Sequence, residues 1–548
     1  MDKDKQRPVA KQSTKLFFSG VFVLTVANIV NKVLGVFMKV PLQNILDNDG
    51  MGYFYDAYTV YTFLFMVSTT GLPTAVSLMI SEARAKGRPL EAKRVYNVTL
   101  ALFTVIGLVG TAIMMAGADV FGNMINTPDA RTCIIFLGPT MFFICITSAL
   151  RGYFQGYQQM APTAISQLIE TVMKVVIGVL FALWAIDAGY DKPYVAAFAI
   201  LGVTIGVALG MVFLLFYKWF FREQKYDEEY YIEGNTYTVS SRKSILKRLV
   251  VIAVPITISA SMMSLTEMID LVILMDRLIS IGKESMDATI LYGSWKSCVV
   301  PLFDLPPVLI YPISYSLIPM IKATLTQGDT KRTSVYMHTS LRLSSILAIP
   351  CALGMSVMAH PIIWMLFGLE DADMGAPLLT ILAPAIFFVC LLSVTNALLQ
   401  ANGYERKPII SMAAGAVVKL TLTYILVGIP EIGMYGVPIS TFCCYFTVSV
   451  CNVYFLVKYV HIKLDFSRMF LRPLISGAAC AVSALGVYCL ASMYTHYIIS
   501  MLLGIMIGVA VYILMIFATK SITEEDIRLI PKADKILGKL RGRKEKRA

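Results

Sequence analysis

The chain has 548 residues, of which 57% are hydrophobic and only 15% are charged, and its mean hydropathy is +0.70. An average soluble domain carries about 25% charged residues, so this composition excludes a soluble enzyme, a disordered protein and a secreted disulfide scaffold. The net charge of +12 fits basic cytoplasmic loops better than a nucleic-acid partner. The sequence therefore predicts an all-α, multi-pass membrane protein that binds no nucleic acid.

Fourteen apolar segments follow in chain order, each long enough for a hydrocarbon core that needs about 20 helical residues. The first run is too long for a signal peptide and lacks a small-residue cleavage site, so we expect a retained helix. The expected spans are 16–38, 53–80, 95–117, 133–151, 164–186, 194–217, 249–274, 298–321, 336–359, 375–400, 408–428, 435–457, 473–493 and 497–519.

The distribution of basic residues predicts the orientation of these spans. With the N-terminus in the cytoplasm, 38 of the 47 Lys and Arg residues lie on or next to the inner loops, and 6 lie on the outer loops. An excess on one side is typical of cytoplasmic loops. We therefore predict that both termini lie in the cytoplasm.

The loops also predict how the chain is divided. No loop is long enough for a catalytic domain, so we expect no enzyme, and the basic C-terminal tail favours contact with anionic membrane lipids. The expected parts are a six-helix lobe at 1–225, a cytoplasmic linker at 226–248, a second six-helix lobe at 249–460, an additional helix pair at 461–519 and the basic tail at 520–548.

Short motifs recur in the two halves of the chain. A Pro–Ser spacing recurs in 72–78 and 311–317, and a Gly-Tyr pair before a proline recurs in 155–162 and 402–408. A lysine follows each of these last prolines, at Lys174 and Lys419. The offsets, about 239 and 246, predict two parallel six-helix repeats, and chance recurrence of Pro and Gly is the alternative.

Ionisable residues inside the expected spans are candidate site residues, because each costs a few kcal/mol in a membrane and usually faces a cavity. A cavity lined by Lys and Arg attracts an anion such as pyrophosphate. The residues expected to form a cationic substrate-binding cavity are Lys32, Lys39, Asp56, Arg151, Lys174, Lys296 and Lys419.

Each of these residues has an alternative interpretation. Glu170 and Lys174 are four residues apart and could neutralise each other on one helix face. Lys32 and Lys419 lie deep in their spans without an acidic residue one helical turn away, which favours a water-filled cavity. The side chains near span ends, which can reach the membrane interface instead, are Lys39, Asp56, Arg151 and Lys296.

Glu267 and Asp270 stand three residues apart on one face of the seventh span. They are candidates for binding Na⁺ or a proton that drives transport, or for pairing with a basic residue opposite. The ten cysteines form no CxxC pair and the four histidines have no metal-ligand spacing. We therefore predict no metal centre and no cofactor beyond such a coupling ion.

Several of these segments resemble those of a known family of membrane proteins. The chain resembles the polysaccharide-export branch of the multidrug/oligosaccharidyl-lipid/polysaccharide exporter superfamily, and within it the stage V sporulation protein B group, relatives of the MurJ lipid II flippases. The segments that carry the resemblance read KVLG at 32–35, DAY at 56–58, TGLP at 70–73, RGYFQGY at 151–157 and PTAISQ at 162–167.

The resemblance implies two six-helix lobes around a central cavity, alternating access, and flipping of undecaprenyl-pyrophosphate-linked saccharides. In the lipid II flippases a basic residue before Val-Leu-Gly serves the cationic cavity, and Lys32 occupies that place. Lys39 falls one position later than the second basic residue of the family, and Asp56 matches its acidic residue before Ala-aromatic. The basic residues that the family carries at the end of the second helix are not matched.

These observations favour a flippase for lipid II, with membrane lipids and the cell-wall synthesis machinery as candidate partners. One alternative is a flippase for another polysaccharide or teichoic lipid-linked unit. Another is a multidrug cation antiporter on the same fold, whose cavity would be acidic or aromatic. A polytopic glycosyltransferase would need carboxylates or a metal on an ordered loop, and the sequence has no such motif.

Overall fold

The computed structural model describes residues 30–31, 34–35, 40–66, 71–220, 238–308, 310, 321, 324–325, 329–404, 406–462, 465–519 and 521. Every regular element in these ranges is helical, and ten helices are long and apolar enough to cross a membrane, or eleven if a bent pair is one span. The predicted all-α, multi-pass fold is therefore confirmed. The count of fourteen spans stays a prediction, because the expected first span lies largely, and the eighth partly, outside the described ranges.

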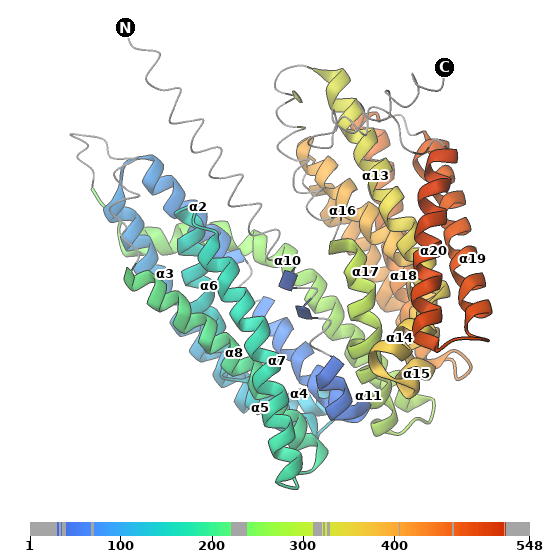
Figure 1. The fold of residues 1–548 in the computed structure, drawn as a ribbon. Helices are drawn as coiled ribbons and strands as arrows, with labels where there is room; N and C mark the ends of the chain where they lie inside the picture. Colours follow the sequence, from blue (N-terminus) through green and yellow to red (C-terminus); the bar gives the residue numbers. More distant parts are fainter. Residues whose placement is uncertain are drawn as a thin grey trace. The chain divides into compact units, whose positions relative to one another are not determined.

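The chain divides into two compact units. The first contains Met1–Pro301 and Leu420–Val437, and the second contains Leu302–Lys419 and Pro438–Ala548. The lobes expected at 1–225 and 249–460 stay a prediction about the family architecture. Figure 1 shows the elements of both units, coloured along the chain.

The first long described helix of the first unit covers residues 40–66, and the helical residues 30–31 and 34–35 precede it. The other helices of this unit are α2 (Gly71–Ala85), α3 (Pro89–Ala116), α4 (Ala118–Met124), α5 (Ala130–Leu137), α6 (Thr140–Gly156), α7 (Ala161–Asp187), α8 (Lys192–Phe220), α10 (Arg242–Ser280), α11 (Ser285–Ser294) and η2 (Trp295–Val299).

The second unit ends in the pair α19 and α20, which lie side by side in Figure 1. The helix α17 crosses the boundary, so its last residues and η3 belong to the first unit. The elements are α13 (Thr330–Val357), α14 (Ala359–Phe367), α15 (Leu369–Leu382), α16 (Ala385–Ala401), α17 (Arg406–Val427), η3 (Gly433–Tyr435), α18 (Gly436–Phe455), η4 (Leu456–Val460), η5 (Ser467–Leu471), α19 (Arg472–Ala491) and α20 (Tyr497–Ala518).

The core of the first unit lies where α6 crosses α2, and the glycines of the RGYFQGY motif make this crossing close. A Cβ atom on Gly152 would lie 2.8 Å from the carbonyl oxygen of Pro73, and one on Gly156 would lie 2.8 Å from the Cβ of Ile80. The aromatic residues Tyr153 and Phe154 of the same motif are fully buried beside this contact. Small residues at such crossings let membrane helices pack by van der Waals contact.

The internal repeat is visible in the helix boundaries. α16 begins at Ala385 and α17 at Arg406, each 245 residues after the start of α6 and α7, and α6 and α16 are both 17 residues long. Lys174 and Lys419 are the fourteenth residues of α7 and α17. The predicted recurrence in this part of the chain is therefore confirmed, whereas the echo at 311–317 lies outside the described residues.

The structure corrects the alignment of the two copies. A residue with left-handed backbone follows each helix, Gln158 (φ 59°) after α6 and Gly403 (φ 85°) after α16. Matching bonds close both ends, from Gln159 N–H to Phe154 O and from Tyr404 N–H to Leu399 O, each 2.9 Å long. Gly403 thus matches Gln158 rather than Gly156, because the helix-ending geometry defines the equivalence and the Gly-Tyr letters do not.

Prolines break two of the expected spans at equivalent places. Pro139 precedes α6 and Pro384 precedes α16, and the pair α15–α16 is bent by 46°. Proline has no N–H to donate and crowds the preceding turn, so it favours a kink or a break in a helix. α6 and α16 therefore begin at the same point of each repeat. α6 carries Arg151, and α16 carries Asn396 at the equivalent position.

Candidate functional site

Arg151 is held inside the first unit by residues of α7. Its Nη2 atom lies 2.9 Å from Oε2 of Glu170, and its Nε atom donates a 3.1 Å hydrogen bond to the Ser166 hydroxyl. The two charged side chains are 14% and 27% exposed. Glu170 is therefore paired with Arg151 on the neighbouring helix, and neither partner reaches outward as the interface alternative required.

Lys174 lies one turn beyond this ion pair on α7. Its Nζ atom is 5.2 Å from the ring centroid of Tyr58, an arrangement that favours a cation. The backbone of α7 is fixed here by α8, because a Cβ on Gly202 would lie 2.4 Å from the Lys174 carbonyl oxygen and one on Gly206 would lie 2.8 Å from its nitrogen. The close helix contact thus determines where the Lys174 side chain emerges.

Lys296 emerges from η2, a single π turn just before Pro301. Its Nζ atom lies 3.5 Å from Oε2 of Glu267 on α10 and 5.9 Å from the ring centroid of Tyr292. Isolated π turns often occur at functional positions because they re-aim a side chain. The pairing with Glu267 also excludes the interface alternative for Lys296 in this structure.

The helix 40–66 connects the two lysines. Tyr58 faces Lys174, and Thr59 shares a hydrogen bond with Tyr292, whose ring lies beside Lys296. Tyr55 and Tyr58 lie on the helix 40–66, and their rings meet edge to face with centroids 6.5 Å apart. Arg151, Lys174 and Lys296, three of the residues expected in a cationic cavity, therefore belong to one region of the first unit.

Asp56 has a different environment from the one expected. Its side chain is fully buried, and neither carboxylate oxygen has a hydrogen-bond partner of good geometry among the described residues, although the Thr127 hydroxyl faces it. Close by, the Thr59 hydroxyl and the Tyr292 hydroxyl share a 2.8 Å hydrogen bond. Asp56 thus lies in a polar contact between the helix 40–66 and α11 and does not reach the membrane interface.

Glu267 and Asp270 have separate environments although they share a helix face. Glu267 pairs with Lys296, one of the three outcomes expected for it. Asp270 is buried (8% exposed), and its Oδ1 atom accepts a 2.8 Å hydrogen bond from the Thr423 hydroxyl of α17. The first carboxylate is therefore engaged by a cation and the second by a neutral donor.

Three expected residues cannot be added to this region. Lys32 and Lys39 lie outside the described residues, and Lys419 belongs to the second unit. The charged groups of the region are Arg151, Lys174 and Lys296 against Glu170, Glu267 and the buried Asp56 and Asp270, so these described residues give no positive excess. A strongly cationic cavity therefore depends on Lys32 and Lys39.

The sequence did not single out Tyr58, Tyr292 or Thr423 as site residues. Tyr58 stands within the DAY motif, so that motif was an available signal. Thr423 lies 153 positions from Asp270, and Tyr292 lies 233 positions from Thr59. No local pattern connects residues so far apart in the chain.

Ionisable side chains held between apolar helices of membrane-spanning length are the features of a multi-pass membrane transporter. The chain belongs to the family described as "Polysaccharide biosynthesis protein", whose model matches residues 17–325, and a second family model, MatE, matches residues 255–425.

Three relatives come from Bacillus subtilis (strain 168). The chain is 26% identical to the uncharacterized membrane protein YabM over 96% of this chain and 97% of the relative. It is 23% identical to stage V sporulation protein B, over 97% of this chain and 99% of the relative. It is 26% identical to lipid II flippase MurJ, over 76% of this chain and 78% of the relative.

Solved structures show the same fold. An inward closed lipid II flippase MurJ superimposes with a TM-score of 0.67 at 15% identity, covering 90% of this chain and 98% of the other. An inward-facing multidrug resistance MATE family transporter of the MOP superfamily gives a TM-score of 0.60 at 17% identity, covering 79% and 94%. The resemblance to the exporter superfamily predicted from the motifs is therefore confirmed.

Proposed function

We propose that this chain flips an undecaprenyl-pyrophosphate-linked saccharide from the cytoplasmic to the outer leaflet of a bacterial plasma membrane, with lipid II as the leading substrate. The saccharide headgroup would enter the site by alternating access while the polyprenyl tail stays in lipid. No bond is made or broken, since the protein only lowers the cost of carrying a polar group through hydrocarbon.

The observation that carries this proposal is the grouping of Arg151, Lys174 and Lys296 in the first unit. Arg151 and Lys296 each pair with a carboxylate and Lys174 faces a tyrosine ring, so an anionic headgroup would add to existing interactions of these cations. A pyrophosphate suits this set, because an arginine offers a planar fork and each lysine a point charge. The relative named as lipid II flippase MurJ supports a lipid-linked substrate.

A multidrug cation antiporter is a second candidate, and the carboxylates of Glu170 and Glu267 together with the tyrosines of the region favour it. These carboxylates are already paired with Arg151 and Lys296. An organic cation would have to displace those partners, whereas an anion would add to them. We therefore rank the flippase above the antiporter, and rank a flippase for another lipid-linked polysaccharide or teichoic unit between them.

Complementation tests the proposal directly. A bacterium depleted of its own lipid II flippase would carry this chain, and surface labelling of lipid II would measure flipping. Loss of a charge-assisted contact costs about 1.5–3 kcal/mol, so Lys174→Met should lower flipping by about tenfold or more, while Lys174→Arg retains much of it. Lys32→Ala and Lys32→Arg should behave in the same way.

The matched control is Lys283→Met, because Lys283 is an exposed lysine in the turn after α10. Its removal should leave flipping unchanged at equal expression. Wild-type flipping by both Lys174→Met and Lys32→Ala would contradict the cationic site, and export of organic cations by the same cells would support the antiporter.

A further inference from the structure

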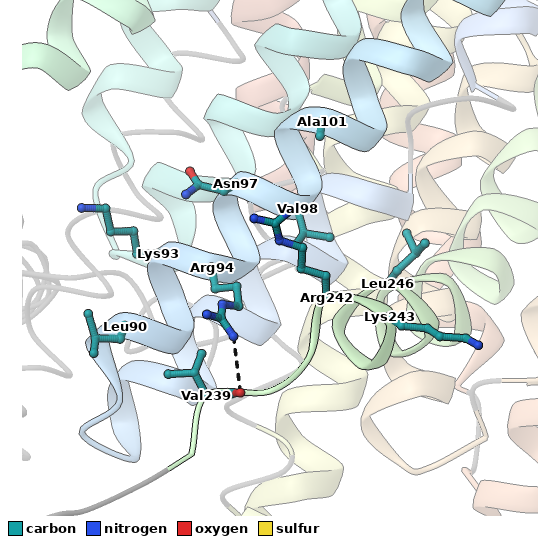
Figure 2. Close-up of a pocket in the computed structure, with 10 residues that line it drawn as sticks. All are labelled: Leu90, Lys93, Arg94, Asn97, Val98, Ala101, Val239, Arg242, Lys243 and Leu246. Carbon is teal, nitrogen blue, oxygen red and sulfur yellow. Dashed lines mark hydrogen bonds between the residues drawn. The ribbon is translucent and has the colours of Figure 1, made fainter.

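A basic cavity lies on the first unit, apart from Arg151, Lys174 and Lys296. It has a volume of about 680 Å³ and is formed by the first turns of α3, the segment before α10 and the first turns of α10. Figure 2 shows its lining residues, which are Leu90, Lys93, Arg94, Asn97, Val98, Ala101, Val239, Arg242, Lys243 and Leu246.

Four of the ten lining residues are basic and none is acidic. The described carboxylates that neighbour them on α2 and α3 are already engaged. Glu82 pairs with Lys86 and Arg248, and Glu91 accepts a 2.6 Å hydrogen bond from the Ser240 hydroxyl and lies 3.5 Å from Arg88. Within the described ranges, the cavity therefore collects cations without a carboxylate to neutralise them.

Hydrogen bonds to the backbone hold the basic segments of the cavity in place. Arg94 donates to the carbonyl oxygens of Val239 (3.5 Å) and Ser240 (3.3 Å), which holds the segment before α10 against α3. Ser241 caps α10 by accepting a 3.2 Å bond from the Ser244 N–H, and the first turn then carries Arg242 and Lys243. Figure 2 shows Arg242 reaching back toward α3.

Cations in the first turn of a helix are unfavourable, because the positive end of the helix dipole lies there. α10 carries two of them and no acidic residue in that turn. A bound anion would reverse the sign of this interaction, since helix N-termini and adjacent Arg and Lys side chains both attract phosphate. This arrangement of charges therefore favours the binding of an anionic ligand.

Apolar lining residues follow the basic ones along both helices. Val98 and Ala101 come after Lys93 and Arg94 on α3, and Leu246, which is 38% exposed, comes after Arg242 and Lys243 on α10. α3 is itself one of the helices long and apolar enough to span a membrane. A ligand here would meet cations at one end and apolar side chains further along both helices, which is the division of an anionic phospholipid.

We propose that this cavity binds the phosphate headgroup of an anionic phospholipid, whose acyl chains lie along α3. It lies on the side of the membrane that the basic loops favour, the cytoplasmic leaflet in the proposed orientation. The inference does not depend on which substrate the transporter flips. Its failure would leave the flippase proposal intact, because a different set of residues carries each.

Native mass spectrometry of the purified full chain tests this inference, with phosphatidylglycerol and phosphatidylcholine of matched acyl chains as probes. The wild type should retain one phosphatidylglycerol with a preference of about fivefold or more over phosphatidylcholine. The triple variant Lys93→Gln, Arg242→Gln, Lys243→Gln should lose that preference. It leaves Arg94, which anchors the neighbouring segment, in place.

A control with the same loss of charge is Lys247→Gln, Lys283→Gln, Arg406→Gln, which neutralises exposed basic residues outside the cavity. It should keep the preference. Ala101→Trp fills the apolar part of the cavity without changing a charge and should also abolish retention, which keeps the test valid if the triple variant misfolds.

Several outcomes would overturn the inference. One is equal retention of phosphatidylglycerol by the wild type and the triple variant, and another is full retention by Ala101→Trp. Inorganic phosphate that competes the lipid away at millimolar concentration would point to a site for free phosphate instead. If the acidic stretch Asp227–Glu229 already neutralised the cavity, the wild type would show no preference, which also contradicts the proposal.

Discussion

The charged residues of the site differ in the kind of partner that each one contacts on a neighbouring helix. Arg151 and Lys296 each pair with a carboxylate, Lys174 lies over an aromatic ring, and Asp270 accepts from a hydroxyl. The sequence predicted that these charges cost free energy inside a membrane, but it did not predict which residues they contact. Partners on other helices are set by packing, which no local spacing encodes.

The Arg151–Glu170 pair should behave as a partly buried ion pair. Arg151→Met leaves the Glu170 carboxylate without its charged donor, so we expect a loss of about 1–3 kcal/mol in stability. The double variant Arg151→Met, Glu170→Met should lose less than the single, because no uncompensated charge remains. Thermal unfolding in detergent measures both.

A matched control for this cycle is Arg131→Met. Arg131 pairs with Asp119 at 2.7 Å, but the two side chains are 56% and 62% exposed. Water replaces such a partner at little cost, so the change should stay within about 1 kcal/mol. Equal effects at the two arginines would show that burial does not control the Arg151 pair.

Glu267 and Asp270 should have separable roles in transport. Asp270→Asn removes a buried carboxylate whose described donor is the Thr423 hydroxyl, so we expect flipping to lose its dependence on Na⁺ or pH. Glu267→Gln frees Lys296 and should change substrate affinity while the ion dependence stays. Flipping assays in vesicles with imposed ion gradients distinguish the two, and unchanged ion dependence in the double variant Glu267→Gln, Asp270→Asn would rule out coupling through this pair.

Among the elements, the helix crossings are built on glycine, and the RGYFQGY motif illustrates this. The motif served as a family signature in the sequence, and the structure gives its glycines a packing reason. Gly152 and Gly156 lie one turn apart on the face of α6 that contacts α2, where a side chain would meet Pro73 or Ile80. Replacing either glycine by a larger residue, even alanine, would therefore push α6 and α2 apart.

Gly152→Ala should therefore destabilise the first unit. Its Cβ would lie 2.8 Å from a carbonyl oxygen and 3.0 Å from a Cα of Pro73, and neither backbone atom can move without shifting α2. Overpacking of this kind costs about 1–3 kcal/mol. The temperature of unfolding in detergent, or the yield of folded protein, measures the effect.

The control is Gly486→Ala in α19, where no atom lies within 4 Å of the added Cβ. Alanine is the better helix former by about 0.5–1 kcal/mol, so this change should be neutral or stabilising. Destabilisation by both substitutions would mean that the α6–α2 contact is not what makes glycine necessary.

At the level of the whole molecule, composition alone predicted the all-α membrane fold, because apolar content and span length are global properties that no tertiary detail can reverse. The internal repeat was also visible, but the match of its glycines was off by two residues. Matching letters aligned Gly403 with Gly156, whereas the left-handed helix ends align it with Gln158. Both glycine and a polar residue can end a helix, so residue identity was a poor guide to position.

Two cysteine reporters can test the predicted topology, and the side-chain exposure in the structure decides where they are placed. Asp371 lies between the expected spans 336–359 and 375–400, but its side chain is buried in α15 (7% exposed). Asp373, whose side chain is 69% exposed, is the better site. Asp373→Cys should react with a membrane-impermeant thiol reagent from outside intact cells, because fourteen spans with a cytoplasmic N-terminus place the beginning of α15 outside.

Lys544→Cys in the basic tail should react only after the cells are opened, since ten Lys and Arg residues between 520 and 548 favour the cytoplasm. Of the ten native cysteines, Cys489 is exposed and would be replaced by serine first, while the other nine are buried or half-buried. Labelling of both reporters from the same side would require an odd change in the number of spans between them. That result would also invert the side on which the basic cavity of α3 and α10 lies relative to one of the termini.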